Sequence, residues 1–179
     1  MQIINLRKVN KKQIEQAIII LKDSFPIWLP TLQDAKEAVD ECLAIENTML
    51  TTVENNVVIG WGGILAPEYN GNVFELHPLV VRYDRRKQGI GKMIVTALEE
   101  EARKQGGKTI HLGADDEKAG GETSLANMDL YDNLSDKIKN FTPGTHQSGF
   151  YMKLGYKIIG VMPDANGYGK PDIYFGKRL

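Results

Sequence analysis

The sequence has little cysteine, almost no net charge and no long hydrophobic run. One residue in 179 is cysteine, so no internal disulfide can form and a reducing compartment is indicated. Lys and Arg total 22 against 23 Asp and Glu, whereas a nucleic-acid surface needs a clear basic excess. The longest apolar candidate, residues 14–21, is interrupted by Glu15 and Gln16 and is too short to span a membrane. We therefore expect a cytoplasmic protein with no nucleic-acid or membrane partner.

The composition is otherwise that of an ordinary globular domain. Hydrophobic residues make up 42% and charged residues 25% of the chain, which argues against disorder. A chain of this length is most simply one domain, residues 1–179, with a sizeable core. The single cysteine, Cys42, lies among apolar residues of a helical pattern, which favours a buried core thiol over a nucleophile.

Hydrophobic periodicity divides the chain into helices and strands. The expected elements, in chain order, are a strand at residues 3–7, helices at 11–23 and 32–45, strands at 47–53, 57–65 and 72–82, a helix ending at 105, a strand at 108–112, short helices near 125–134 and 150–154, and strands at 156–161 and 173–175. Apart from the short helix near 125–134, the order is βααβββαβαββ. It predicts an α/β fold with a mixed sheet.

The most informative segment is the basic loop Arg85–Lys92, which lies between an apolar strand and an amphipathic helix. The unpaired N–H groups and the positive dipole end of a helix N-terminus bind phosphate. Gly89 and Gly91 let the main chain approach such a ligand closely. From the spacing alone, a solvated helix start without a ligand explains the loop equally well.

The strand before this loop contains Pro78, which cannot donate to a sheet ladder. We expect a bulge there, because proline is rare in a central strand; an edge strand is the alternative. Glu75 and His77 are two residues apart and therefore share one face of the strand. The glycines of the preceding strand, Gly60, Gly62 and Gly63, also suggest a bulge or a close approach.

Several longer strings resemble those of a known family. They are Arg86-x-x-Gly89-x-Gly91 and the stretches 74–81 (FELHPLVV), 109–116 (TIHLGADD), 150–161 (FYMKLGYKIIGV) and 163–173 (PDANGYGKPDI). Together they are similar to the GNAT superfamily of acyl-CoA N-acyltransferases, and within it to the aminoglycoside 6′-N-acetyltransferases of the chromosomal enterococcal type. The resemblance implies the GNAT fold, a mixed central sheet flanked by helices. It also implies acetyl transfer from acetyl-CoA to the 6′-amine of an aminoglycoside.

The resemblance also implies which residues do this work. Glu75 would help bind the amine and take its proton, with His77 as second candidate and a structural histidine as its alternative; His111 and His146 are weaker candidates. The Leu79 N–H would stabilise the thioester oxyanion, and Tyr151 would protonate the departing thiolate. Residues expected to contact the coenzyme are Leu79, Val81, Arg86, Gln88, Gly89, Ile90, Gly91, Lys92 and Tyr151.

The acceptor side is expected to be acidic, since aminoglycosides are polycations. Between residues 115 and 136 a run of carboxylates is opposed only by Lys118, although such a run is usually a solvated face. Within it we favour Asp115, which ends a strand, as a substrate-binding residue. Trp28 is the expected sugar platform. For Trp61 and Tyr69, as for Trp28 itself, ordinary burial is the simpler interpretation.

No metal is implied, and no nucleophilic Cys or Ser motif is visible, so direct sequential transfer is expected. The resemblance further implies a homodimer. Two alternatives stay open: the same chemistry on another amine, such as a polyamine, a protein lysine or a protein N-terminus, and a coenzyme-A-binding protein without catalysis.

Overall fold

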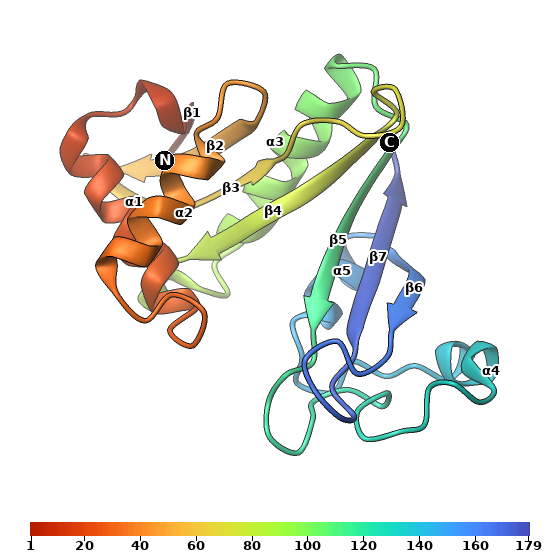
Figure 1. The fold of residues 1–179 in the computed structure, drawn as a ribbon. Coiled ribbons are helices and arrows are strands. Elements are labelled where there is room, and N and C mark those ends of the chain that lie inside the picture. Colours follow the sequence, from red (N-terminus) through yellow and green to blue (C-terminus); the bar gives the residue numbers. More distant parts are fainter. The chain divides into compact units, whose positions relative to one another are not determined.

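Seven strands form a mixed sheet in the order β1-β2-β3-β4-β5-β7-β6 in a computed structural model that describes residues 1–179 (Figure 1). The chain divides into two units, residues 1–110 with Leu179, and residues 111–178. Each unit is described by itself. One domain over residues 1–179 stays a prediction. The expected order of strands and helices is confirmed, with one further short helix, α4.

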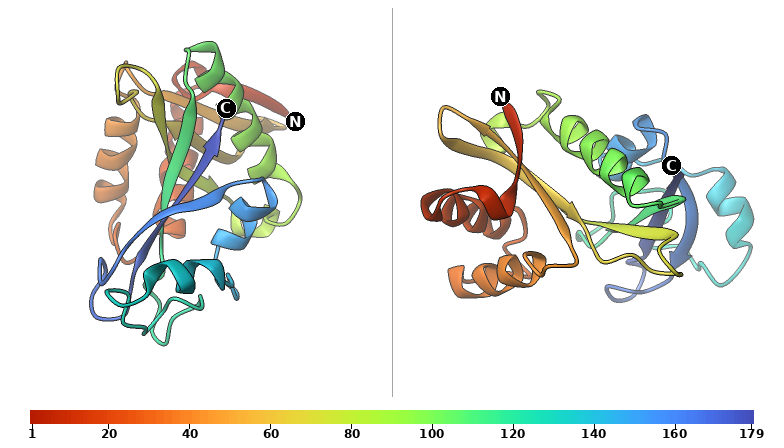
Figure 2. Two further views of the ribbon diagram at one scale, coloured as in Figure 1. Left: turned by 90° about the vertical axis from the view of Figure 1, so that its right-hand side faces the viewer. Right: turned by 90° about the horizontal axis from the view of Figure 1, so that it is seen from above.

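The first unit places helices on both faces of its strands. Its elements are β1 (Gln2–Asn5), α1 (Lys11–Ser24), α2 (Leu32–Cys42), β2 (Thr48–Glu54), β3 (Val57–Ile64), β4 (Val73–Val81) and α3 (Ile90–Lys104), and β5 (Thr109–Asp115) begins in it. Helices α1 and α2 lie on one face and α3 on the other (Figure 2). Strand β3 is therefore buried on both faces, which explains its uninterrupted apolar sequence.

The two N-terminal helices begin at capping boxes. Asn10 caps α1 with Gln13, and Thr31 caps α2 with Asp34. Helix α2 ends at Cys42 rather than at the predicted Ile45, because the side-chain amide of Asn47 donates to the carbonyl oxygens at the helix end, those of Glu41 and Cys42.

The core of the first unit lies between α1, α2 and the sheet. Trp61 is fully buried, and its indole N–H donates to the carbonyl oxygen of Ala17 in α1 at 3.0 Å. Trp61 is therefore a packing residue, which confirms ordinary burial, the simpler interpretation of the sequence. Cys42 is buried as predicted, and burial raises the pKa of its thiol to about 11.

The predicted bulge at Pro78 is present in β4. Gly62 of β3 pairs with Leu79 and Ile64 pairs with Leu76, so Gly63 faces two residues of β4 where regular pairing would give one. A Cβ on Gly62 would lie 2.7 Å from the carbonyl oxygen of Pro78. The glycine thus allows the close backbone approach that the bulge requires, and the edge-strand alternative for Pro78 is wrong, since β4 lies inside the sheet.

The second unit contains residues 111–115 of β5, the helices α4 (Leu134–Lys139) and α5 (Ser148–Lys153), and the strands β6 (Lys157–Met162) and β7 (Asp172–Arg178). Strand β7 lies between β5 and β6. Helix α5 confirms the predicted turn near 150–154. The helix predicted near 125–134 is wrong: a helix begins only at Leu134, after Asn133 in the left-handed region, and Asp116 accepts backbone N–H groups of the loop before it.

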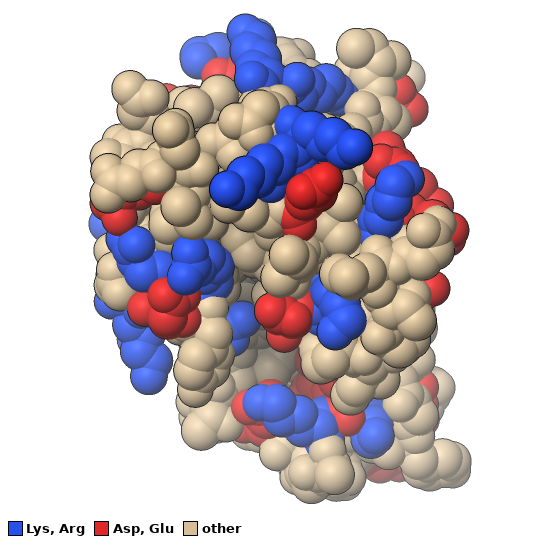
Figure 3. Space-filling model, turned by 90° about the vertical axis from the view of Figure 1, so that its left-hand side faces the viewer, with Lys and Arg blue, Asp and Glu red and all other residues tan.

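Basic and acidic side chains are interspersed on the face drawn in Figure 3. No single sign of charge dominates that face, in keeping with a formal net charge of −1. None of the helices is both long enough and apolar enough to span a bilayer.

Candidate functional site

The basic loop after β4 has the geometry of an anion-binding helix N-terminus. Gly89 is the N-cap of α3 with φ of 83°, a left-handed conformation that favours glycine. No side chain caps this helix, so the N–H groups of its first turn are left for a ligand. The predicted coenzyme residues Gln88, Gly89 and Lys92 are all exposed here.

The two arginines of this loop have different surroundings. Arg85 forms an ion pair with Glu54 at 2.7 Å, and its hydrogen bond lowers the pKa of that carboxyl. Arg86, the predicted coenzyme residue, is exposed; it donates to the carbonyl oxygen of Val81 at 3.1 Å and lies over the ring of Tyr83. Arg85 is thus held by a carboxylate, whereas Arg86 has only neutral partners and keeps its full charge for an anion.

Strand β4 carries four of the predicted residues at positions that are at least partly exposed. Its burial alternates strictly, with one set of side chains partly or fully exposed and the other set buried. The accessible set is Val73, Glu75, His77, Leu79 and Val81, and the buried set is Phe74, Leu76, Pro78 and Val80. All four predicted residues thus lie on the strand that leads into the basic loop. The bulge changes the face of the strand, so Leu79 and Val81 lie on the face opposite to Glu75.

Two aromatic residues of the first unit are exposed in loops. Trp28 is 59% exposed, between α1 and α2, and Tyr69 is 73% exposed, between β3 and β4. Ordinary burial was the simpler interpretation for both, and it is wrong. Exposed aromatic rings can pack against a ligand.

Tyr151 lies in α5 of the second unit and is buried. Its ring contacts those of Phe150 and Tyr156, at centroid distances of 5.0 and 5.8 Å. Burial raises the pKa of the Tyr151 hydroxyl well above its usual value. The hydroxyl therefore keeps its proton at any working pH and is a hydrogen-bond donor throughout.

Asp115 is the last residue of β5, which extends beyond the predicted end at residue 112, and its side chain is exposed. The amide of Asn166 donates to its carboxylate at 2.5 Å. Burial raises the pKa of Asp172, at the start of β7, and the negative charge of Asp115 adds to the shift. One oxygen of Asp172, Oδ1, is buried without a hydrogen-bond partner. The carboxyls of Asp115 and Asp172 thus lie close enough for their charges to interact.

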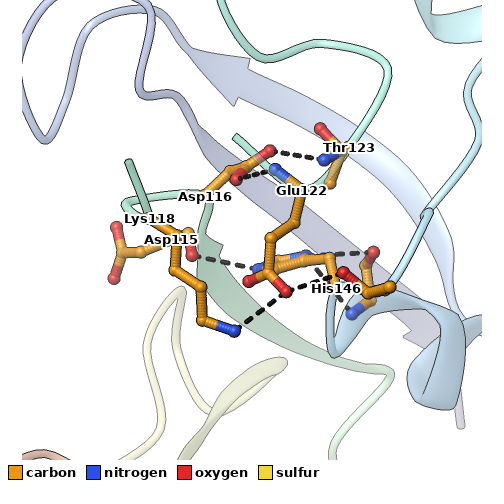
Figure 4. A network of polar contacts seen from close by, with 8 residues as sticks. Asp115, Asp116, Lys118, Glu122, Thr123 and His146 are labelled. Carbon is orange, nitrogen blue, oxygen red and sulfur yellow. Dashed lines mark hydrogen bonds and ion pairs between the residues drawn. The ribbon is translucent and has the colours of Figure 1, made fainter. Parts of the chain in front are cut away.

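Two of the other carboxylates in the run, Asp116 and Glu122, hold the loop together (Figure 4), whereas Asp129, Asp132 and Asp136 are exposed as in a solvated face. Asp116 is fully buried and accepts the backbone N–H groups of Glu122 and Thr123, each at 2.8 Å. Glu122 accepts from Lys118 and Thr145; burial raises its pKa, but these hydrogen bonds outweigh burial and lower it. Asp116 and Glu122 therefore fasten the loop, which leaves Asp115 as the exposed carboxylate at the strand end.

The same network contains His146, which was only a weak candidate in the sequence analysis. His146 is buried, with one ring nitrogen 3.0 Å from the carbonyl oxygen of Asp115 and the other 3.1 Å from the hydroxyl of Ser148 (Figure 4). A histidine in a polar loop gives no periodic or motif signal, so only the folded structure reveals this placement. His111, on β5, is partly exposed and is not part of this network.

No three His, Cys, Asp or Glu side chains are grouped so that they could hold a metal ion. The predicted residues fall into two sets, one on β4 and the loop Arg86–Lys92, and one in the second unit at Asp115 and Tyr151. Trp28 belongs to neither set and lies in the loop between α1 and α2.

Family comparison agrees with this geometry. Residues 14–121 match the acetyltransferase (GNAT) family, and the chain belongs to that family. A comparison with curated protein sequences gave no match.

Among solved structures, the chain is similar to an aminoglycoside 6′-N-acetyltransferase complexed with coenzyme A, with 37% identity, a TM-score of 0.92, and coverage of 99% of this chain and 97% of that one. The aminoglycoside 6′-N-acetyltransferase from Enterococcus faecium gives the same identity and coverage with a TM-score of 0.90. An aminoglycoside 6′-acetyltransferase type Ii is 32% identical, with a TM-score of 0.77 and the same coverage.

Proposed function

We propose that this chain transfers the acetyl group of acetyl-CoA to the 6′-amine of aminoglycosides. The observation that carries the proposal is the similarity at 37% identity, over 99% of this chain, to an aminoglycoside 6′-N-acetyltransferase complexed with coenzyme A. In the reaction the acetyl C–S bond breaks and a C–N bond forms. The amine loses a proton, and the departing sulfur must gain one.

The first unit fits the coenzyme. The uncapped N-terminus of α3 offers main-chain N–H groups to the pyrophosphate, and Arg86 adds a cation whose present partners are neutral. The exposed Gln88, Gly89 and Lys92 lie along this loop, with Ile90 and Gly91 in the first helical turn. These residues hold the coenzyme but take no part in the bond changes.

On β4, Leu79 and Glu75 have separate roles. The bulge at Pro78 interrupts the regular ladder next to Leu79. The Leu79 N–H donates to the thioester oxygen as negative charge develops on that oxygen. Val81, on the same face as Leu79, lies along the pantetheine. Glu75 takes the amine proton, directly or through water, because only the neutral amine attacks. His77, two residues on, is the second candidate for that role.

Tyr151 supplies the hydrogen bond to the departing sulfur. Burial raises the pKa of the Tyr151 hydroxyl. The hydroxyl therefore donates a hydrogen bond to the thiolate and does not transfer its proton to it. Its effect is therefore to stabilise the leaving group as the C–S bond breaks, and the sulfur takes its proton from solvent water when the thiol is released.

Asp115 and Trp28 serve the acceptor. The exposed Asp115 carboxylate attracts an ammonium group, and the exposed ring of Trp28 is a platform for a sugar. Transfer is direct, with no acyl-enzyme. The only thiol, Cys42, is buried with its pKa raised to about 11, so little thiolate is available to attack a thioester.

The test is thiol release from acetyl-CoA with kanamycin, neamine, spermidine and a lysine-rich peptide offered separately. Turnover with the two aminoglycosides alone, and a product acetylated at the 6′-amine by mass spectrometry and NMR, is expected. Turnover with spermidine or the peptide alone would assign the same chemistry to another amine. Coenzyme binding without turnover of any amine would make the chain a coenzyme-binding protein.

We further propose that the protein is a cytoplasmic homodimer that confers aminoglycoside resistance. The lone buried cysteine suits a reducing compartment, and acetylation removes a positive charge from the drug. Sedimentation at micromolar concentration should give twice the 20.0 kDa chain mass. Expression in a susceptible bacterium should raise the inhibitory concentration of kanamycin, and a Glu75→Gln variant should not.

A further inference from the structure

We propose that His146 is a positioning residue that fixes the strand end carrying Asp115 to the helix carrying Tyr151. The inference rests on the proposed function, which gives those two residues their roles. It concerns only the second unit, where all three residues lie.

The hydrogen bonds of His146 define its tautomer. The carbonyl oxygen of Asp115, 3.0 Å from Nε2, can only accept, so Nε2 carries the ring proton. Nδ1 then accepts, from the Ser148 hydroxyl at 3.1 Å and from the Ser148 N–H at 3.4 Å. Both ring nitrogens of a neutral imidazole are thereby used, and neither is left for a substrate.

The two ends of this bridge are the residues that matter for the reaction. Asp115 ends β5, and its carbonyl and carboxylate belong to the same residue, so holding one restricts the other. Ser148 begins α5, and Tyr151 lies one turn further along that helix. His146 is 6% exposed and Ser148 is fully buried, so water does not compete for these bonds.

The loop around His146 is itself fastened. Thr145, its neighbour in the chain, donates to Glu122 at 2.9 Å, and Glu122 also pairs with Lys118 (Figure 4). Asp116, next to Asp115, accepts two backbone N–H groups of the same loop. These contacts fix the loop that carries His146 and so fix the position of the imidazole. Its hydrogen bonds then restrict the positions of Asp115 and of the start of α5.

Two substitutions separate the two arms of the bridge. His146→Asn keeps a polar atom near the position of Nδ1 and loses the bond to Asp115. His146→Gln keeps one near Nε2 and loses the bond to Ser148. Because small displacements of reacting groups cost up to about 100-fold, we expect changes of about tenfold. His146→Asn should raise the KM for kanamycin with little change in kcat, and His146→Gln should lower kcat with little change in KM.

A matched control is Ser124→Ala. The Ser124 hydroxyl accepts the Thr142 N–H at 2.8 Å in the same loop, without touching Asp115 or α5. It should lower the melting temperature while leaving KM and kcat within about twofold, as expected for a residue outside the reacting groups. If each His146 variant both raises KM and lowers kcat, in proportion to the fall in its melting temperature, His146 is structural only and the inference is wrong.

Amide hydrogen exchange gives a readout that needs no substrate. His146→Asn should speed exchange around residues 112–118, and His146→Gln around residues 147–155, each with little change in the other segment. Equal exchange in both variants would overturn the bridge. Wild-type protein that fails to acetylate any aminoglycoside would overturn the proposed function instead, and the exchange pattern would still decide whether His146 joins the two segments.

Discussion

At the scale of single residues, the surroundings of Tyr151 decide what it can do. Burial keeps its hydroxyl protonated, so Tyr151→Phe removes a donor without changing a charge. Positioned proton donors contribute about 100-fold or more, and we expect kcat to fall by about that factor with the KM for acetyl-CoA unchanged. Because the pKa is raised, ionisation of Tyr151 should cause no loss of wild-type kcat at alkaline pH up to about 10, the usual tyrosine value.

Steady-state kinetics from pH 6 to pH 10, with near-ultraviolet circular dichroism as the check on folding, would decide this. A Tyr151→Phe variant that is folded and turns over like wild type would remove Tyr151 from the reaction.

Glu75 and His77 lie on the same face of β4, and a pair of variants separates them. Glu75→Gln keeps size and loses the proton acceptor, so kcat/KM at pH 6 should fall about 100-fold. The loss should shrink as pH rises, because more of the amine is then already neutral. His77→Gln is the matched variant and should stay within about threefold if the histidine is structural. The opposite ranking would make His77 the base.

Asp172 illustrates how a residue near the proposed acceptor position can lower stability. Its pKa is raised from the ordinary 3.8 by burial and by the charge of Asp115, so the folded protein binds this proton more tightly than the unfolded chain. Stability from this group is complete at low pH and declines as pH rises above about 4, the unfolded aspartate value.

Asp172→Asn should therefore raise the melting temperature, by more at pH 8 than at pH 4, as measured by calorimetry at both values. Asp164→Asn is a comparison on the neighbouring loop, where the carboxylate accepts the Gly169 N–H at 2.7 Å. It should show no such gain. An Asp172→Asn variant less stable than wild type at pH 8 would mean that its hydrogen bonds outweigh its burial.

At the scale of elements, the bulge in β4 depends on the small size of Gly62. Its added Cβ would lie 2.7 Å from a backbone oxygen, which cannot move aside cheaply. Overpacking of this kind costs about 1–3 kcal/mol, and Gly62→Ala should lose about 2 kcal/mol of unfolding free energy in urea. Gly160→Ala is the control, because the nearest atom to its Cβ is at 3.5 Å, an ordinary contact. Equal stability of the two variants would show that the bulge tolerates a side chain.

The elements show why part of the fold could be predicted and part could not. Pro78 has no N–H, so the sequence predicts either a bulge or an edge strand, and the position of β4 inside the sheet excludes the edge strand. The helix α3 likewise follows from Gly89 and an apolar stripe. Helix α4 was misplaced because the loop before it has no periodic pattern and forms local contacts in place of a helix; the Asp129 carboxylate, for example, accepts the Tyr131 N–H.

The candidate residues divide in the same way. Glu75, Arg86 and Tyr151 lie in motifs, so resemblance identifies them. The placement of His146 depends on a contact between residues 31 positions apart, and the exposure of Trp28 depends on where α1 and α2 end. Neither is a local property of the sequence.

At the scale of the whole molecule, coenzyme binding should appear as thermal stability, whatever amine is used. A ligand that binds only the folded state stabilises it by about 2.7 kcal/mol at 100 times its dissociation constant. For a chain of this length 1 kcal/mol shifts the melting temperature by about 2–4 °C, so saturating coenzyme A should raise it by about 5–10 °C.

The loop arginines test where that stability comes from. Arg86→Gln should lose most of the shift and weaken its dependence on salt, because Arg86 has no carboxylate partner of its own. Arg85→Gln should lower the melting temperature of the free protein slightly, since its ion pair with Glu54 is partly buried, yet keep most of the shift. Differential scanning calorimetry of both variants, with and without coenzyme A, measures the melting temperature of the free protein and the shift on coenzyme binding. If Arg85→Gln abolished the shift and Arg86→Gln did not, the phosphate contact would belong to Arg85, and the motif would be assigned to the wrong arginine.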